Sequence, residues 1–104
     1  MDTRTRTETL RLLTKGRYTV SSSDGRRRGE ATVPSISYVS ATPLLVMAAL
    51  DPRSRLFGCL AESRVADINI IASSRVLHCL VRYIVRVSAR AIVILEVVEA
   101  ERAA

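Results

Sequence analysis

A two-residue alternation of apolar side chains runs through residues 76–98 and limits the fold more than any other feature of this chain. Every odd position from Leu77 to Val97 is apolar, and every charged residue of the segment occupies an even position. Successive side chains of a β-strand point to opposite faces, so this period predicts a sheet with one buried face. One strand of that length would span about 75 Å, so the chain must turn back or change type within it.

Two structures for this segment satisfy the pattern. A turn at Ser88-Ala89-Arg90 would produce a β-hairpin in which the odd residues of both strands share a face. Alternatively, residues 75–90 form a helix, because Arg82, Arg86 and Arg90 also fall on one helical stripe, and a strand follows over residues 91–98. Both alternatives place a strand at 91–98. The same three arginines argue against a membrane span, since each is costly near the bilayer centre.

The first forty residues predict a polar β-meander. Its extended runs are TETLRLLT, RYTVSSS, RRRGEATV and SISYVSA. Asp24-Gly25 lies between the second and third runs and is a strong signal for a two-residue hairpin turn. For residues 1–6, a disordered basic arm is an open alternative.

The middle of the chain predicts two short helices. Thr42-Pro43 suits the start of a helix through LLVMAAL, which Asp51-Pro52 would end. A second helix is expected within residues 53–68. The predicted fold is therefore a small single α+β domain over residues 1–104, with an N-terminal polar β-meander, two short central helices and a C-terminal β-hairpin, or a helix and then a strand, forming the core.

Charge points to an anionic partner. The net charge is +6, and residues 1–30 carry eight basic side chains against four acidic ones. Such an excess attracts polyanions. A hairpin tip bearing three guanidinium groups after the Asp24-Gly25 turn could contact successive phosphates. The predicted nucleic-acid-binding residues are Lys15, Arg17, Arg26, Arg27, Arg28, Arg82 and Arg86.

Neither catalytic nor metal-binding chemistry is indicated. His78 and Cys79 would point to opposite faces of a strand, and together with Cys59 they lack the usual spacing of metal ligands. We therefore expect no catalytic residue, no metal, no cofactor and no small-molecule ligand. Both cysteines are expected to be buried free thiols. The N-terminus lacks the apolar core of a signal peptide, which favours a cytoplasmic location.

These observations favour a small non-enzymatic protein that contacts nucleic-acid phosphates through an arginine-rich hairpin tip. The alternative is a protein-interaction or assembly module whose apolar strands pair with a partner, including a second copy of the chain as a homodimer. DNA and RNA are not distinguished.

Two segments also resemble parts of known families. Arg82-Tyr83, the strand at 91–98 and Arg102 are similar to the C-terminal hairpin of RelE/ParE-type bacterial toxins, although the upstream helical region of that family is not recognisable. This resemblance implies a ribonuclease as a third alternative. Residues 14–20, TKGRYTV, resemble the opening of AbrB-type DNA-binding domains, without the proline and the later Gly-Asp turn of that family.

Overall fold

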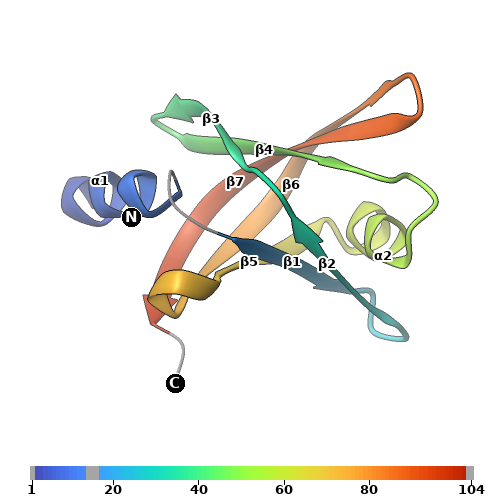
Figure 1. Ribbon diagram of the computed structural model, residues 1–104, viewed down its shortest axis with the longest axis horizontal. Helices are drawn as coiled ribbons and strands as arrows, with labels where there is room; N and C mark the ends of the chain where they lie inside the picture. Colours follow the sequence, from blue (N-terminus) through green and yellow to red (C-terminus); the bar gives the residue numbers. More distant parts are fainter. Residues whose placement is uncertain (1, 14–16, 103–104) are drawn as a thin grey trace.

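A computed structural model describes residues 2–13 and 17–102, which form one curled antiparallel sheet and two α-helices (Figure 1). The elements in chain order are α1 (Thr3–Leu13), β1 (Tyr18–Ser23), β2 (Arg28–Val33), β3 (Ser37–Ala41), β4 (Leu44–Leu50), α2 (Arg55–Ser63), β5 (Val65–Ile70), the 3₁₀ helix η1 (Ile71–Ser73), β6 (Arg75–Val87) and β7 (Arg90–Arg102).

The strands are ordered β2-β1-β5-β6-β7-β4-β3. All neighbours are antiparallel. The sheet curls until β2 approaches β4, which gives a partly closed barrel. Helix α2 packs on β1 and β2 at one end of it, and α1 lies at the other (Figure 1). We call these the α2 end, which includes the turns at 24–27, 51–54 and 88–89, and the α1 end, which includes η1 and the last residues of β7.

The core lies inside this curl and is mostly aliphatic. Alternate residues of each central strand point inward, as a pleated strand with one buried face requires. Helix α2 contributes Leu56 and Leu60. The strand residues with no exposed surface are Val20, Val46, Ile68, Ile70, Ala91 and Val93.

A β-bulge divides β6 into two halves. The pairing with β7 shifts between Val81 and Tyr83. Before the bulge, Leu77, Cys79 and Val81 are buried, but after it the odd residues turn outward, and Tyr83 is 62% exposed. The bulge thus leaves an apolar surface on the outside of the sheet. We call it the outer apolar face, consisting of Met47, Tyr83, Val85, Val87, Ile92 and Ile94.

The expected α+β fold with central helices is wrong, because the protein is mostly antiparallel sheet. Residues 7–13, expected to be extended, belong to α1, as do residues 3–6, for which a disordered arm was the open alternative. Residues 44–50, expected to be helical, form β4, in which Leu44, Val46, Ala48 and Leu50 are buried at alternate positions. The run itself is apolar throughout, and its pairing with β3 on one side and β7 on the other outweighed the helix-start signal of Thr42-Pro43.

Two other segments need correction. The second expected helix, within residues 53–68, is confined to α2, and residues 65–70 form β5. The helical alternative for residues 75–90 is also wrong, since β6 is a strand and its hairpin turn is at Ser88 and Ala89.

Two further findings concern membrane spans and cysteines among the residues that the structure describes. No helix among them is both long and apolar enough to cross a membrane. Cys59 and Cys79 are free and buried, as predicted, and burial raises the pKa of the Cys79 thiol well above its ordinary value.

Candidate anion-binding site

The arginine-rich turn between β1 and β2 is held in shape by Asp24. One oxygen of its carboxylate, Oδ1, accepts the backbone N–H groups of Arg26 at 2.9 Å and Arg27 at 2.8 Å. Because the carboxylate receives these bonds, from Arg27 first and then Arg26, the pKa of Asp24 lies below its ordinary value. The turn therefore has a defined backbone, and its arginine side chains extend into solvent from a fixed base.

The loop before α2 is built in a similar way. Asp51 Oδ1 accepts the backbone N–H of Arg53 at 2.9 Å, and Ser54 caps the helix by accepting the N–H of Phe57 at 3.1 Å. The bond from Arg53 lowers the pKa of Asp51. A capped helix start carries partial positive charge, and here exposed Arg53 and Arg55 add two full charges.

Gly29 brings the turn and the helix together. A Cβ placed on Gly29 would lie 2.4 Å from Cα of Leu56, so β2 contacts the first turn of α2 without room for any side chain. One helical turn further on, the Arg27 guanidinium lies beside Gly58, and the Cys59 thiol donates to the Arg27 carbonyl at 3.7 Å. The β1–β2 turn therefore runs alongside α2.

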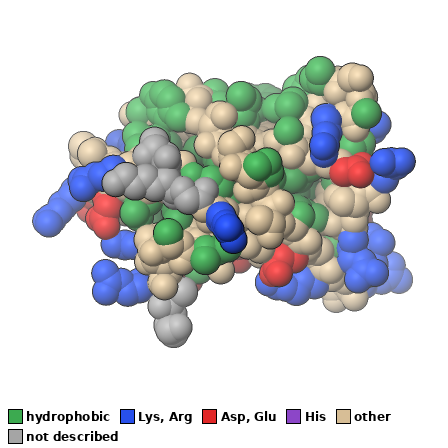
Figure 2. All heavy atoms as spheres, viewed as in Figure 1, with side chains coloured by type: hydrophobic (Ala, Val, Ile, Leu, Met, Phe, Trp, Pro, Cys, Tyr) green, Lys and Arg blue, Asp and Glu red, His purple; other side chains and the backbone are tan. Residues whose placement is uncertain are grey.

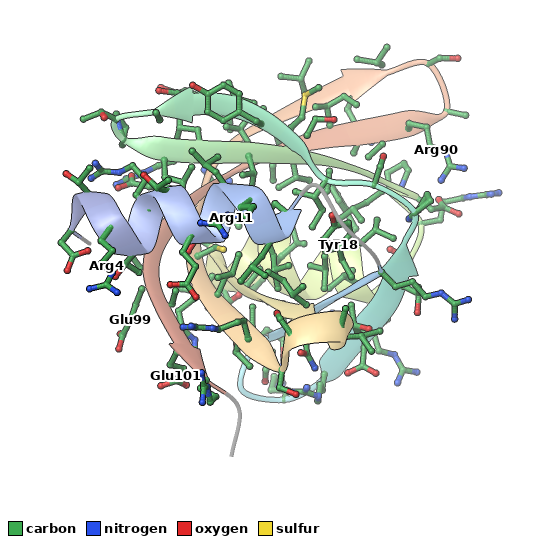
Figure 3. The ribbon with its side chains drawn as sticks, turned by 60° about the vertical axis from the view of Figure 1, so that its left-hand side comes forward. Arg4, Arg11, Tyr18, Arg90, Glu99 and Glu101 are labelled. Carbon is green, nitrogen blue, oxygen red and sulfur yellow. The ribbon has the colours of Figure 1, made fainter. Side chains whose placement is uncertain are left out.

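The β6–β7 hairpin contributes one more arginine to this region, Arg90. Leu50 pairs with Ala91, so the next residues along these antiparallel strands, Asp51 and Arg90, lie close to each other. The charge of Arg90 contributes to the lowered pKa of Asp51. Figure 3 shows Arg90 far from Arg4 and Glu101, which belong to the α1 end.

We call this surface the basic end. Figure 2 shows its charged side chains on the right of the molecule, mostly blue with a few red. Its arginines are Arg26, Arg27, Arg28, Arg53, Arg55 and Arg90. Asp24, Glu30 and Asp51 pair with Arg27, Arg28 and Arg53 at 3.3 to 3.6 Å. Within the described residues, Arg26, Arg55 and Arg90 have no carboxylate at ion-pair distance. They are free to bind an anionic ligand.

The structure separates the seven predicted site residues. Arg26, Arg27 and Arg28 lie together on the turn, but Arg17 precedes β1 and lies at its opposite end. Lys15 lies outside the described residues. Arg17 is therefore separated from the turn by the length of β1.

Arg82 and Arg86 do not form the expected row. Arg82 pairs with Glu96 at 2.6 Å. Arg86 lies beyond the bulge and is paired in register with the buried Ala91. Because the bulge changes the alternation between them, the two side chains do not follow the four-residue spacing that an unbroken strand would give.

The predicted site residues leave out three arginines of the basic end: Arg53, Arg55 and Arg90. Arg53, Ser54 and Arg55 precede the apolar residues of α2, and a serine directly before such a run is a helix-capping signal. That signal indicates a helix start, but it does not reveal which strand lies against it.

A separate polar cluster lies at the α1 end. His78 Nδ1 is 2.7 Å from Asp67 Oδ1, and His78 Nε2 is 2.7 Å from Glu101 Oε1. These bonds, that to Glu101 first, raise the pKa of His78 despite its partial burial. No group of three metal-ligating side chains is found among the residues that the structure describes. The cluster ties β5, β6 and β7 together.

Comparisons with known proteins give a consistent fold. No family model matches the sequence, and no curated protein matches it either. Among solved structures, the flavin reductase of styrene monooxygenase from Pseudomonas putida S12 has a TM-score of 0.73 and 14% identity, covering 91% of this chain and 86% of its own. Flavoredoxin from Methanosarcina acetivorans has 0.74 and 10%, covering 83% and 67%. The FMN-binding protein from Thermus thermophilus has 0.73 and 10%, covering 83% and 70%.

At these identities the likeness establishes the fold. It overturns the predicted functions, because the structures that share this fold are named as flavin reductases and FMN-binding proteins, not as nucleic-acid-binding proteins. The expectation of a nucleic-acid partner and no small-molecule ligand is therefore wrong. None of these three structures is named for the activities of the assembly-module and ribonuclease alternatives.

Proposed function

We propose that this protein binds a flavin nucleotide and acts as a flavin reductase, holding the flavin where a reduced nicotinamide can transfer hydride to it. The observation that carries the proposal is the juxtaposition, in a fold shared with flavin reductases, of the basic end and the outer apolar face. A flavin mononucleotide has the same two parts, a doubly charged phosphate and a flat, largely apolar ring system.

The register of the sheet places the two surfaces side by side. Val85 pairs with Ile92, and Ile92 with Ala49, which forms one row across β6, β7 and β4. The next row on the same face holds Val87 and Arg90. Consecutive rows on one face of a strand are about 7 Å apart. A ligand contacting the apolar row with its ring therefore has guanidinium groups within reach of its phosphate.

The donor set at the start of α2 fits a phosphate. Guanidinium groups bind phosphate oxygens through charge-assisted, often bidentate hydrogen bonds. Arg53 is available in this role because its side chain is 90% exposed and meets only the partly exposed Asp51. The first backbone N–H groups of a helix, which have no partner within the helix, complement the same charge.

The protein residues would bind and orient, and the flavin supplies the hydride-accepting chemistry when bound. Arg53 and Arg90 hold the phosphate, which fixes the position of the ligand along the sheet. The apolar row excludes water from one side of the ring system. No side chain is required to donate a proton for hydride transfer itself, so the role of the chain is positioning.

The test compares two ligands that differ in the phosphate alone. FMN and riboflavin are titrated into the purified protein while the quenching of flavin fluorescence is followed. We expect Arg53→Ala to weaken FMN by about tenfold, the size expected for losing a charge-assisted hydrogen bond, and to leave riboflavin unchanged. Arg17→Ala removes an equal charge at the other end of β1 and serves as the control.

Catalysis is tested by following the oxidation of NADH and NADPH with free flavin present. Turnover that depends on both flavin and protein supports the reductase. Flavin binding without turnover would restrict the protein to carrying flavin. Absence of binding to either flavin contradicts the proposal as a whole.

A further inference from the structure

The basic end extends further than one phosphate needs. Arg53 and Arg55 lie at the start of α2, whereas Arg26 shares a hollow with Glu62 near the end of that helix. Nine helical residues span about 13 Å, so Glu62 lies well apart from the start of α2, and the Arg27 guanidinium beside Gly58 lies between them. A single phosphate at the start of α2 therefore does not reach Glu62.

The hollow at the far end has a volume of about 480 Å³ and is lined by Asp24, Arg26, Arg27 and Glu62. Asp24 is only 6% exposed, and its carboxylate is engaged by the backbone of the turn. The groups that face a ligand are therefore two exposed guanidiniums and one exposed carboxylate. Arg26 has no ion-pair partner among the described residues, and Arg27 meets Asp24 at 3.4 Å.

This combination of groups matches a nucleotide better than a simple anion. Guanidiniums take phosphate oxygens, and a nearby carboxylate accepts hydrogen bonds from ribose hydroxyls, as carboxylates do in other dinucleotide sites. The contact between Gly29 and the start of α2 keeps the surface between the two groups of cations continuous. A ligand can thus lie along α2 from Arg53 to Arg26.

We propose that the β1–β2 turn binds the adenosine diphosphate arm of a dinucleotide, with Arg26 and Arg27 on the phosphate that carries the adenosine and Glu62 on the ribose. The proposal rests on the flavin site described above and extends it, because that site holds one phosphate at the start of α2. Two dinucleotides carry this arm: FAD and the reduced nicotinamide NADH. Their shared chemistry is what the hollow recognises.

The experiment measures the affinities of FMN, FAD, NADH and ADP for the parent protein and the double variant Arg26→Ala/Arg27→Ala. We expect the double variant to weaken ADP by about tenfold and to leave FMN unchanged. A loss shared by FAD assigns the arm to the flavin, and a loss shared by NADH assigns it to the reductant. The control variant, Arg17→Ala/Arg102→Ala, removes the same charge from exposed positions at the α1 end.

The outcomes separate this proposal from the proposed function. If FMN binds but ADP does not, the flavin site stands and the adenosine arm is rejected. If ADP binds through Arg26 and Arg27 while neither flavin binds, the arm stands and the flavin site is rejected. Equal weakening of ADP by both double variants would show that net charge alone attracts it, and that also rejects the arm.

Discussion

The two ends of the sheet hold their charged groups differently. At the α1 end, charged side chains bind one another across elements: Arg75 pairs with Glu8 at 2.6 Å, and His78 bridges Asp67 and Glu101. At the α2 end, the carboxylates of Asp24 and Asp51 accept hydrogen bonds from backbone N–H groups, and the neighbouring arginine side chains stay exposed. Exposed arginines occur at both ends, so the α2 end is distinguished by the ordered turns that gather its arginines beside the start of α2.

The ends also differ in how tightly their helices are attached. Helix α2 contacts β1 and β2 along its length and contributes fully buried Leu56 and Leu60. Helix α1 buries Thr9 and Leu13, and the Tyr18 hydroxyl donates to the Leu13 carbonyl. Figure 3 shows Arg4 and Arg11 projecting from α1. We therefore expect changes under α2 to affect stability and binding together, and changes near α1 to affect stability by less.

The largest effect is expected from Gly29→Ala. The added Cβ would lie 2.4 Å from Cα of Leu56 and 2.5 Å from its backbone nitrogen, and backbone atoms cannot move aside as a flexible side chain can. Overpacking of this kind should cost about 2 to 3 kcal/mol of the free energy of unfolding, measured by urea denaturation. Flavin affinity should fall as well, because the start of α2 must shift.

Gly58→Ala is the matched control for this prediction. A Cβ on Gly58 would meet only the end of the Arg27 side chain, at 3.7 Å. Since alanine is the better helix former, this change should stabilise the protein by about 0.5 to 1 kcal/mol. Equal destabilisation by both substitutions would contradict the role given to the Gly29 contact.

A smaller effect, visible in acid, is expected from Asp24→Ala. The folded-state pKa of Asp24 lies below its ordinary value of 3.8, because its carboxylate accepts the Arg27 and Arg26 amides. The stabilisation is therefore present above that value and is lost as pH falls through the folded-state pKa. The parent should lose stability in acid over this range more steeply than the variant. The test is to measure the urea midpoints of both proteins across the acid range. If the two midpoints fall in parallel with pH, the prediction is contradicted.

Much of the fold at the α2 end was hidden from the sequence for a physical reason. The run Leu44 to Leu50 is apolar at every position, so the sequence carries no strand period there, and its Thr-Pro start favoured a helix. The alternating burial of β4 is visible only in the structure. The position of Arg26 beside α2 was not predictable, because it depends on a close contact between Gly29 and Leu56 that no local pattern encodes. That Arg26, Arg27 and Arg28 form an anion-binding site stays a prediction, whereas the nucleic acid assigned as their ligand is contradicted by the comparisons.

The bulge in β6 shows the same limit. The alternation of residues 76–98 continues unchanged through Arg82, so the sequence alone indicates one buried face along the whole segment. The register shift beside Arg82 turns Tyr83, Val85 and Val87 outward. A bulge of this kind depends on the pairing between two strands, and single-strand periodicity does not report it. The outer apolar face could therefore not be predicted.

At the α1 end, His78→Gln should give a pH-dependent effect of opposite sign. Its bonds to Glu101 and Asp67 raise the folded-state pKa of His78 above 6.5. The stabilisation is thus fully present below 6.5 and is lost as pH rises through the folded-state pKa. Because about a third of the His78 side chain is exposed, with solvent-accessible partners, the gain should stay below about 1 kcal/mol. The double variant Asp67→Asn/Glu101→Gln should abolish the same pH dependence of stability. If the pH dependence persists in this variant, it arises from a group other than His78.

The smallest effect is expected from Arg82→Ala. The pair between Arg82 and Glu96 is short, at 2.6 Å, but the arginine side chain is 47% exposed, and exposed pairs contribute about 0.5 kcal/mol or less. Removing Arg82 should therefore change the urea midpoint little and leave FMN affinity unchanged, in contrast to Arg53→Ala. Arg82 is a matched control for Arg53 because each arginine has a carboxylate partner, Glu96 and Asp51 respectively. A large loss of FMN affinity on Arg82→Ala would mean that phosphate binding is not confined to the α2 end.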